Sequence, residues 1–402
     1  MELSLNSMLN AFSRGLDYVE HDLTGISSHH SKRVAYICAR MGKQFGLNES
    51  ENSDIVGCAL LHDSALPEYI QEESAQGNEV LKSKKVNTPR HCVIGEEYVK
   101  NIPFRGDVGN FILYHHESAD GQGAFGKRGD EIPLGAALIH LGDRVDAFFH
   151  LNNVSDGKYS EIADFMKNGA GKFFLPRHAE AFLDIFHSKE SFTDMIDREI
   201  DNALNKMLPM HHENYSPEQL ISFASFFAKI IDYKSRFTRD HSMGLAEKAD
   251  VMADYYHFDT EKKAQYHLAA ALHDIGKLAV DSNILEKPDR LTPAEFTAIQ
   301  DHAWHSYSIL SEIDGFQPLG SWAALHHEKL DGSGYPFGLL APELGFEERL
   351  MACLDIYQAL VEKRPYKEGM SHQKAMSILD KLVQGGRIDG DIVGDVNKAF
   401  VG

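Results

Sequence analysis

The chain of 402 residues has few cysteines and no long apolar run, and both shortages limit what it can be. The four cysteines lie far apart without a CxxC pair, so neither a thiolate zinc site nor a disulfide framework is expected. No apolar stretch approaches the roughly 20 residues that span a bilayer. The N-terminus also lacks the basic start and apolar block of a secretory signal. We therefore expect a cytoplasmic protein without a membrane partner.

Positive charge is also scarce, with 40 Lys and Arg against 60 Asp and Glu, a formal charge of −20. Binding to a DNA or RNA polymer depends on many basic residues that neutralise phosphates, so no such partner is expected. An anionic substrate would have to be attracted by a local group of positive charges. Alternating β-branched runs are scarce too, which favours an all-α fold.

Histidine, in contrast, is abundant, with 22 residues, and many of them recur at a fixed interval. With the chain laid over itself at an offset of 211, one set of metal-binding residue types coincides with a second, and Asp143 matches Asp355 at an offset of 212. The first set is His30, His62, Asp63, His91, His115 and His116. The second set is His241, His273, Asp274, His302, His326 and His327. A period of this size indicates two tandem copies of one helical bundle domain.

The boundary between the copies is expected near 208–220, which divides the chain into domains 1–208 and 209–402. Ser216 as N-cap, Pro217 in the first turn and Gln219 form a capping box that starts a helix. Thr292 and Glu295 form a second capping box, ahead of His302. The apolar stripe of the first helix predicts packing in a core or an interface; it comprises Phe223, Phe227, Ile230 and Ile231.

His273 and Asp274 follow the apolar run LAAAL at 268–272, at the point where a core helix ends. A buried imidazole and carboxylate lose their hydration, and a metal ion can compensate both. Neighbouring helical residues point about 100° apart, so the two side chains suit two adjacent ions better than one. The nitrogen and oxygen donors of the repeated set favour Fe, Mn or another first-row cation over calcium. We therefore predict a two-metal centre, with Lys277 facing the same cavity one turn later.

Three segments of the second half resemble the HD-GYP phosphodiesterases, a branch of the HD-domain metal-dependent phosphohydrolases. They are HDIGK at 273–277, HHEKLDGSGYP at 326–336 and RPYK at 364–367. The resemblance covers about residues 216–385. It implies a helical bundle around two or three divalent metal ions that hydrolyses cyclic dinucleotides.

The resemblance also assigns metal ligands by position, with Asp274 as the carboxylate that bridges two ions. The implied ligands are His241, His273, Asp274, His302, His326, His327 and Asp355. Members with a third metal carry glutamate where this chain has Asp232, so Asp232 is a weaker candidate ligand. The chain departs from the family at Asp240, in place of glycine, and at Gln358, in place of aspartate.

Substrate contacts are likewise carried over from the resemblance. Lys277, Arg364 and Lys367 match residues that hold substrate phosphate. The glycines of the loop at 332–336 allow Tyr335 to approach the site. Asp274 and Lys277 are thus the expected catalytic residues.

The first half keeps the repeated ligand types but lacks the substrate-binding groups. Leu66 stands at the position of Lys277, DGQGAF at 120–125 replaces DGSGYP, and no RPYK segment follows Asp143. We predict a degenerate domain used for packing, for regulation or for forming a homodimer.

These features predict a phosphodiesterase that opens 3′3′-cyclic GMP-AMP or cyclic di-GMP to a linear dinucleotide. Two cations about 3.5 to 4 Å apart would activate a bridging water, as hydroxide, for attack on phosphorus. A degenerate HD domain before an HD-GYP domain resembles the arrangement in bacterial phosphodiesterases that act on cyclic GMP-AMP, which favours that substrate. Two alternatives stay open: an HD phosphohydrolase for another nucleotide, and a non-catalytic cyclic dinucleotide sensor.

Overall fold

The computed structural model describes residues 1–24, 29–75, 88–208, 211–235, 240–287, 289–363 and 368–401. They divide into two compact units. The N-terminal unit comprises Leu5–His211, and the C-terminal unit comprises Met1–Ser4 together with His212–Gly402. The first four residues therefore fold with the second half of the chain.

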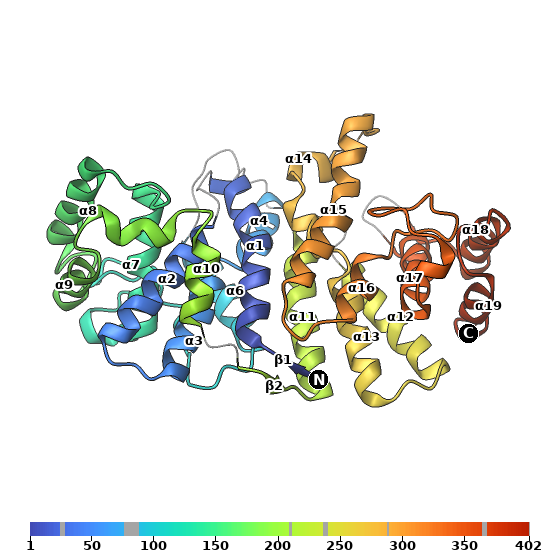
Figure 1. Ribbon diagram of the computed structural model, residues 1–402, viewed down its shortest axis with the longest axis horizontal. Coiled ribbons are helices and arrows are strands. Elements are labelled where there is room, and N and C mark those ends of the chain that lie inside the picture. The colour runs from blue at the N-terminus through green and yellow to red at the C-terminus, as the bar shows by residue number, and fades with distance from the viewer. Residues whose placement is uncertain are drawn as a thin grey trace. The chain divides into compact units, whose positions relative to one another are not determined.

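The N-terminal unit is built from helices (Figure 1). The α-helices are α1 (Leu5–Thr24), α2 (His30–Gln44), α3 (Glu49–Leu60), α4 (Leu66–Ala75), α6 (Thr88–Val99), α7 (Leu134–Phe149), α8 (Asp156–Gly169), α9 (Pro176–Ile185) and α10 (Ile200–Met207). Short 3-10 helices are η1 (Gly129–Glu131) and η2 (Lys189–Met195). Helix α2 packs against α3, α7 and α10 and forms the centre of this unit.

The C-terminal unit repeats this helical plan and adds a two-stranded ribbon. Its α-helices are α11 (Pro217–Tyr233), α12 (His241–Tyr255), α13 (Thr260–Leu272), α14 (Ser282–Leu285), α15 (Pro293–Ser311), α16 (Leu319–Ala324), α17 (Phe346–Val361), α18 (His372–Gln384) and α19 (Gly390–Ala399). The 3-10 helices are η3 (Ile275–Ala279) and η4 (Ala341–Glu343). Strand β1 (Glu2–Leu3) pairs antiparallel with β2 (Glu213–Asn214). The prediction of an all-α fold is confirmed.

Both predicted capping boxes start helices in the C-terminal unit. The Ser216 hydroxyl accepts from Gln219 N and the Gln219 side chain accepts from Ser216 N, which satisfies two amides at the start of α11. Thr292 and Glu295 do the same at the start of α15. The local pattern therefore fixes where the helix that carries His302 begins.

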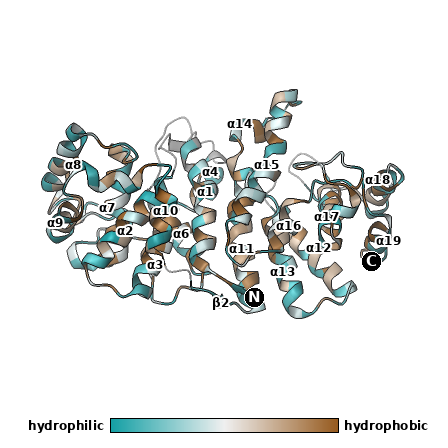
Figure 2. Ribbon diagram, in the orientation of Figure 1, coloured by the Kyte–Doolittle hydropathy of each residue, from teal (hydrophilic) through white to brown (hydrophobic). Residues whose placement is uncertain are grey.

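Helix α11 lies in the core of the C-terminal unit, where it packs against α12 and α13. Its predicted apolar stripe is buried, and much of its ribbon is coloured as hydrophobic in Figure 2. Burying these aromatic and branched side chains supplies most of the force that holds such helices together. Within the described part of the chain, no helix combines the length and the apolar character needed to cross a bilayer.

Candidate metal centre

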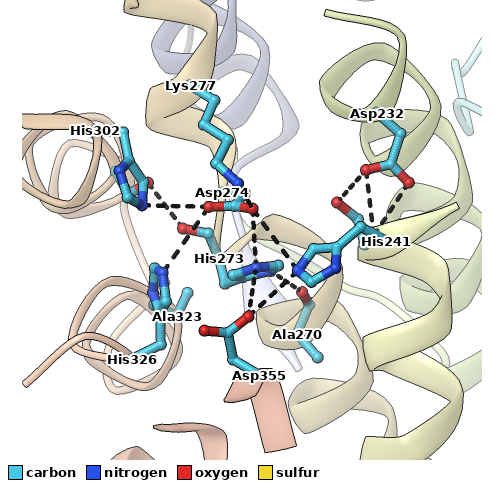
Figure 3. A network of polar contacts seen from close by, with 12 residues as sticks. Asp232, His241, Ala270, His273, Asp274, Lys277, His302, Ala323, His326 and Asp355 are labelled. Carbon is cyan, nitrogen blue, oxygen red and sulfur yellow. Dashed lines mark hydrogen bonds and ion pairs between the residues drawn. The ribbon is translucent and has the colours of Figure 1, made fainter. Parts of the chain in front are cut away.

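Histidine and aspartate side chains from five segments of the C-terminal unit converge on one point (Figure 3). They come from the start of α12, the junction of α13 and η3, the middle of α15, the turn after α16 and the middle of α17. The structure thus brings together the seven predicted ligands of this unit. They form three groups whose potential ligand atoms lie within 4.8 Å of one another: His241, His273 and Asp355; His273, Asp274 and His326; His302, His326 and His327.

Asp274 lies at the centre of the cluster (Figure 3). One carboxylate oxygen, Oδ2, lies 3.1 Å from His273 Nε2, and the other, Oδ1, lies 3.3 Å from His302 Nε2 and 3.9 Å from His326 Nε2. The two oxygens therefore face different histidines. This is the geometry of a carboxylate that can contact two cations at once.

A second carboxylate, Asp355, closes one side of the cluster. Its Oδ1 lies 3.2 Å from His241 Nε2 and 3.9 Å from His273 Nε2. Its Oδ2 lies 3.9 Å from His327 Nδ1. Asp355 thus joins helix α17 to the groups around Asp274.

Backbone hydrogen bonds fix the orientation of three histidine rings. The Nδ1 atoms of His273, His302 and His326 lie 2.7, 2.5 and 2.7 Å from the carbonyl oxygens three residues earlier, those of Ala270, Ile299 and Ala323. A carbonyl only accepts, so Nδ1 carries the proton and Nε2 presents its lone pair to the centre. These three Nε2 atoms and Asp274 Oδ1 are buried and have no hydrogen-bond partner among the described residues. Such unsatisfied buried atoms fit metal coordination.

Electrostatics favour the metal-binding protonation state at two members of the cluster, Asp274 and His326. Burial alone would raise the pKa of Asp274, but His273 and Lys277 hold it well below its usual range. Burial, together with the nearby His273, lowers the pKa of His326 to about 3. Ionised carboxylates and neutral imidazoles are the forms that coordinate metals.

Lys277 and Tyr335 lie at the edge of this cluster. The Lys277 ammonium contacts Asp274 Oδ2, so the lysine points into the site as predicted. The ring of Tyr335 lies with its centroid 4.7 Å from that of His327 and 6.4 Å from that of His302. Tyr335 thus covers two of the candidate ligands.

Three other predicted residues have different outcomes. Arg364 and Lys367 lie outside the described residues. Asp232 is buried on α11, where its carboxylate accepts hydrogen bonds from the Ser242 amide and hydroxyl, the latter at 2.6 Å. Burial raises the pKa of Asp232 to about 7, which distinguishes it from the ionised carboxylates of the cluster.

The carboxylate of Glu328, which sequence reasoning missed, organises the glycine-rich loop. It is buried and accepts from the amides of Phe337, Gly338 and Leu339 at 2.7 to 3.1 Å. A Cβ atom at Gly334 would lie 2.5 Å from Glu328 Cα, so only glycine fits there. The signal was present in the sequence, because Glu117 occupies the matching position at the offset of 211.

His241 has a carboxylate partner that sequence reasoning also missed. Glu362, at the end of α17, lies with Oε2 2.7 Å from His241 Nδ1. Burial would lower the pKa of His241, but Asp355 and Glu362 together raise it to about 9. Such a carboxylate orients a metal-binding histidine through its other ring nitrogen.

The N-terminal unit makes the same contact with a different residue. His30 Nδ1 lies 2.6 Å from Asp146 Oδ2, and Arg33 Nε donates to Asp146 Oδ1 at 2.7 Å. At the matching positions the C-terminal unit has Gln358 and Gly244, whose side chain and backbone lie in close contact. The C-terminal unit thus has a neutral, compact pair where the N-terminal unit has an ion pair, and its histidine contacts Glu362 instead.

The N-terminal unit also gathers the predicted repeat of the ligand set. His30, His62 and Asp143 form one group, and His91, His115 and His116 form another, which also includes Cys92. Asp63 Oδ1 lies 3.4 Å from His91 Nε2 and 3.8 Å from His115 Nε2. The geometry of the candidate ligands is therefore conserved between the two copies, although Leu66 replaces the lysine.

Comparison with known families matches this duplication. Two models, both described as HD domain, match residues 225–392 and residues 28–147. Each match includes one of the two histidine and aspartate clusters.

Individual relatives extend the similarity to almost the whole chain. The chain is 30% identical over 405 residues to 3′3′-cGAMP-specific phosphodiesterase 1 of Vibrio cholerae, covering 97% of this chain and 90% of the relative. It is 44% identical over 124 residues to a probable cyclic di-GMP phosphodiesterase of the same organism, covering 28% of each. The crystal structure of a cyclic GMP-AMP-specific phosphodiesterase from V. cholerae has the same fold, with a TM-score of 0.67, 24% identity, and coverage of 99% of this chain and 98% of that one.

Proposed function

Because the chain belongs to the family of HD-domain phosphodiesterases, we propose that its C-terminal unit hydrolyses a cyclic dinucleotide, 3′3′-cyclic GMP-AMP first, to a linear dinucleotide. The observation that carries the proposal is the position of Asp274 between histidines whose Nε2 atoms are buried and lack hydrogen-bond partners among the described residues. The base preference is supported by the relative that aligns along nearly the whole chain, which is specific for 3′3′-cGAMP.

The residues present fit two divalent cations. His241, His273 and Asp355 would hold one, while His302, His326 and His327 would hold the other, with Asp274 between them. The all-nitrogen and oxygen donor set favours Fe or Mn. Two cations bound here would lower the pKa of water and stabilise charge on the reacting phosphate. Asp232 already accepts two hydrogen bonds from Ser242, so the proposal places no third ion there.

The remaining side chains would hold and shape the substrate. Lys277 reaches the cluster from η3 and would neutralise a phosphate oxygen. Tyr335 lies over His327, where its ring would border the nucleotide. Arg364 and Lys367 are proposed as further phosphate contacts on the basis of the RPYK segment.

The first test is to incubate the protein, loaded with Mn or Fe, separately with cyclic GMP-AMP, cyclic di-GMP and cyclic di-AMP. Products are separated by chromatography, and cyclic GMP-AMP should be opened fastest. A variant with His273→Ala and Asp274→Asn is the matched inactive control. Survival of all three substrates, at measured metal occupancy, would contradict the proposal and favour a sensor instead.

Lys277→Ala should lower kcat by about 100-fold, because one positive group that meets charge on the phosphate is lost. Metal content should not change, since the lysine is no ligand. Lys263→Ala, a surface change on the preceding helix, is the control. Unchanged kinetics for Lys277→Ala would remove it from the site.

Two further proposals concern the whole chain. A cytoplasmic location agrees with the composition, and a homodimer agrees with a first domain that lacks substrate-binding groups. Sedimentation at several protein concentrations tests the dimer.

A further inference from the structure

A cavity of about 360 Å³ lies in the N-terminal unit, beside its histidine cluster. His91 and His116 line one side, and His140 and Arg144 of α7 line another. Ala124, in the loop that corresponds to DGSGYP, lies at its border. The volume falls at the lower end of the range for small-molecule sites.

Comparison of the two copies explains the space. Ala124 matches Tyr335 at the offset of 211. In the C-terminal unit the tyrosine ring packs near His302 and His327. In the N-terminal unit the matching histidines, His91 and His116, face the cavity instead. Loss of one aromatic ring has therefore opened room beside the cluster.

The same cavity has gained two polar side chains. His140 and Arg144 match Ala352 and Ile356 at the offset of 212 that relates the two α7-type helices. They are four residues apart on α7, so they lie on one face of the helix. Each of the two keeps a buried side-chain nitrogen that no described residue satisfies, Nε2 of His140 and Nε of Arg144.

The Arg144 guanidinium is oriented by an aromatic ring and is able to bind an anion. Its guanidinium lies 3.9 Å from the centroid of the Phe173 ring, which fixes the plane of the group. Its Nε is buried and has no hydrogen-bond partner among the described residues. A guanidinium in this state pairs well with the oxygens of a phosphate.

His140 offers a hydrogen-bond acceptor to the cavity, so a ligand there needs a hydrogen-bond donor. Its side chain is buried, and its Nδ1 donates to the His115 carbonyl at 3.0 Å. Nε2 therefore carries the lone pair, and no described residue satisfies it. A ligand that carries a phosphate and a hydroxyl or amino group would satisfy both side chains, the phosphate accepting from Arg144 and the other group donating to His140.

We infer that this cavity binds a small phosphate monoester, of the nucleoside monophosphate class, with its phosphate on Arg144 and a hydroxyl or amino group on His140. The inference concerns binding alone, because Leu66 stands where the C-terminal unit has the phosphate-facing Lys277. The N-terminal unit is then a nucleotide-binding regulatory domain.

Calorimetric titration of the full chain with GMP, AMP and inorganic phosphate tests the inference. Arg144→Ala should weaken one class of sites by about 10- to 100-fold, because a charge-assisted contact to phosphate is lost. Ala124→Tyr should do the same by refilling the cavity. Arg177→Ala, an exposed arginine of the same unit, should bind as the unchanged protein does.

The outcomes separate this inference from the proposed hydrolysis. Binding is measured without turnover, and Lys277→Ala should leave the Arg144-dependent sites intact. If inorganic phosphate binds these sites as tightly as GMP, the nucleoside part of the inference is wrong. If neither Arg144→Ala nor Ala124→Tyr changes binding of any probe, the cavity is not a ligand site.

Discussion

At the scale of single residues, one candidate-ligand histidine has a carboxylate partner in both copies, although the partner comes from different positions. In the N-terminal unit Asp146 serves both His30 and Arg33. In the C-terminal unit, Gln358 stands at the position of the aspartate and Gly244 at that of the arginine. The carboxylate that contacts His241 is Glu362, at the end of α17. The contact is retained, although no position in the repeat predicts Glu362.

Glu362→Gln should therefore weaken metal binding in the C-terminal unit by about 10- to 100-fold, the usual effect of losing such a partner. The neutral amide no longer stabilises the orientation and basicity of the His241 ring. Competition with a metal chelator measures the change. Glu368→Gln, at an exposed glutamate nearby, is the matched control, and equal affinities for the two variants would show that Glu362 has no such role.

A histidine away from the clusters gives a pH effect on stability. Burial, with a smaller effect of Arg177, lowers the pKa of His178 to about 4, against about 6.5 in the unfolded chain. Between these values the unfolded state binds more protons, so stability is complete above pH 6.5 and falls as the pH drops toward 4. The largest loss of unfolding free energy that this one histidine can cause is roughly 3 kcal/mol.

His178→Phe should remove this part of the pH dependence, because phenylalanine fills the same place beside Phe45 without titrating. Thermal unfolding at pH 5 and pH 7 measures the difference between variant and unchanged protein. The exposed His187→Gln should keep the original slope. Identical slopes for His178→Phe and the unchanged protein would contradict the assignment.

At the scale of secondary-structure elements, the contact between η3 and α15 positions the cluster. Gly276 N donates to the Ser306 hydroxyl, which in turn donates to the His273 carbonyl. A Cβ atom at Gly276 would lie 1.9 Å from the His302 carbonyl oxygen, so the two elements meet backbone to backbone. The absence of a side chain here sets the distance between His273 and His302.

Gly276→Ala should destabilise the protein by about 2 to 3 kcal/mol, because α15 must move away from η3. The same movement displaces His302, so metal binding should weaken as well. Gly394→Ala, on α19, meets nothing within 4 Å and should be neutral or stabilising by up to about 1 kcal/mol. Denaturant unfolding and metal content distinguish the two variants. If Gly276→Ala were as stable as the unchanged protein, η3 and α15 would not meet this closely.

The sequence predicts those parts of the fold and of the site that depend on neighbouring residues or on the repeat, and it misses those that depend on contacts between distant residues. The capping boxes at Ser216 and Thr292 lie within four residues, and the pattern alone placed both helix starts. The candidate ligands were predicted because the chain holds two copies of the same spacing. Glu362 and the cavity residue Arg144 were missed because each differs between the copies, and the pairing of β1 was missed because two residues form no pattern.

At the scale of the whole molecule, the two copies differ in the side chains that surround the same kind of cluster. The C-terminal unit keeps Lys277 and Tyr335 beside its cluster. The N-terminal unit has lost both and has Arg144 and a cavity instead. Each cluster of this strongly acidic chain thus has a basic side chain beside it, Lys277 in the C-terminal unit and Arg144 in the N-terminal unit.

The start of the chain also connects to its middle, because β1 belongs to the unit that resumes some 200 residues later. Tyr215 N donates to the Met1 carbonyl at 2.8 Å, and the N-terminal ammonium lies 3.0 Å from Glu261. Gly315, with φ of 81°, approaches so closely that a Cβ atom would lie 2.6 Å from the Glu2 carbonyl oxygen. Strand β1 thus supports the connection between α15 and α16, and those elements position His302 and His326.

Leu3→Ala should therefore destabilise the C-terminal unit by about 2 to 5 kcal/mol, since the Leu3 side chain is fully buried. Hydrogen exchange followed by mass spectrometry should show faster exchange in β2 and in the segment between α15 and α16. Metal binding should weaken with it, because the two histidines lose a fixed support. Glu2→Ala, at an exposed neighbour in the same strand, should leave hydrogen exchange and metal binding unchanged. If Leu3→Ala also left both unchanged, β1 would not support the site. A C-terminal unit that begins at residue 212 would then keep its metal binding.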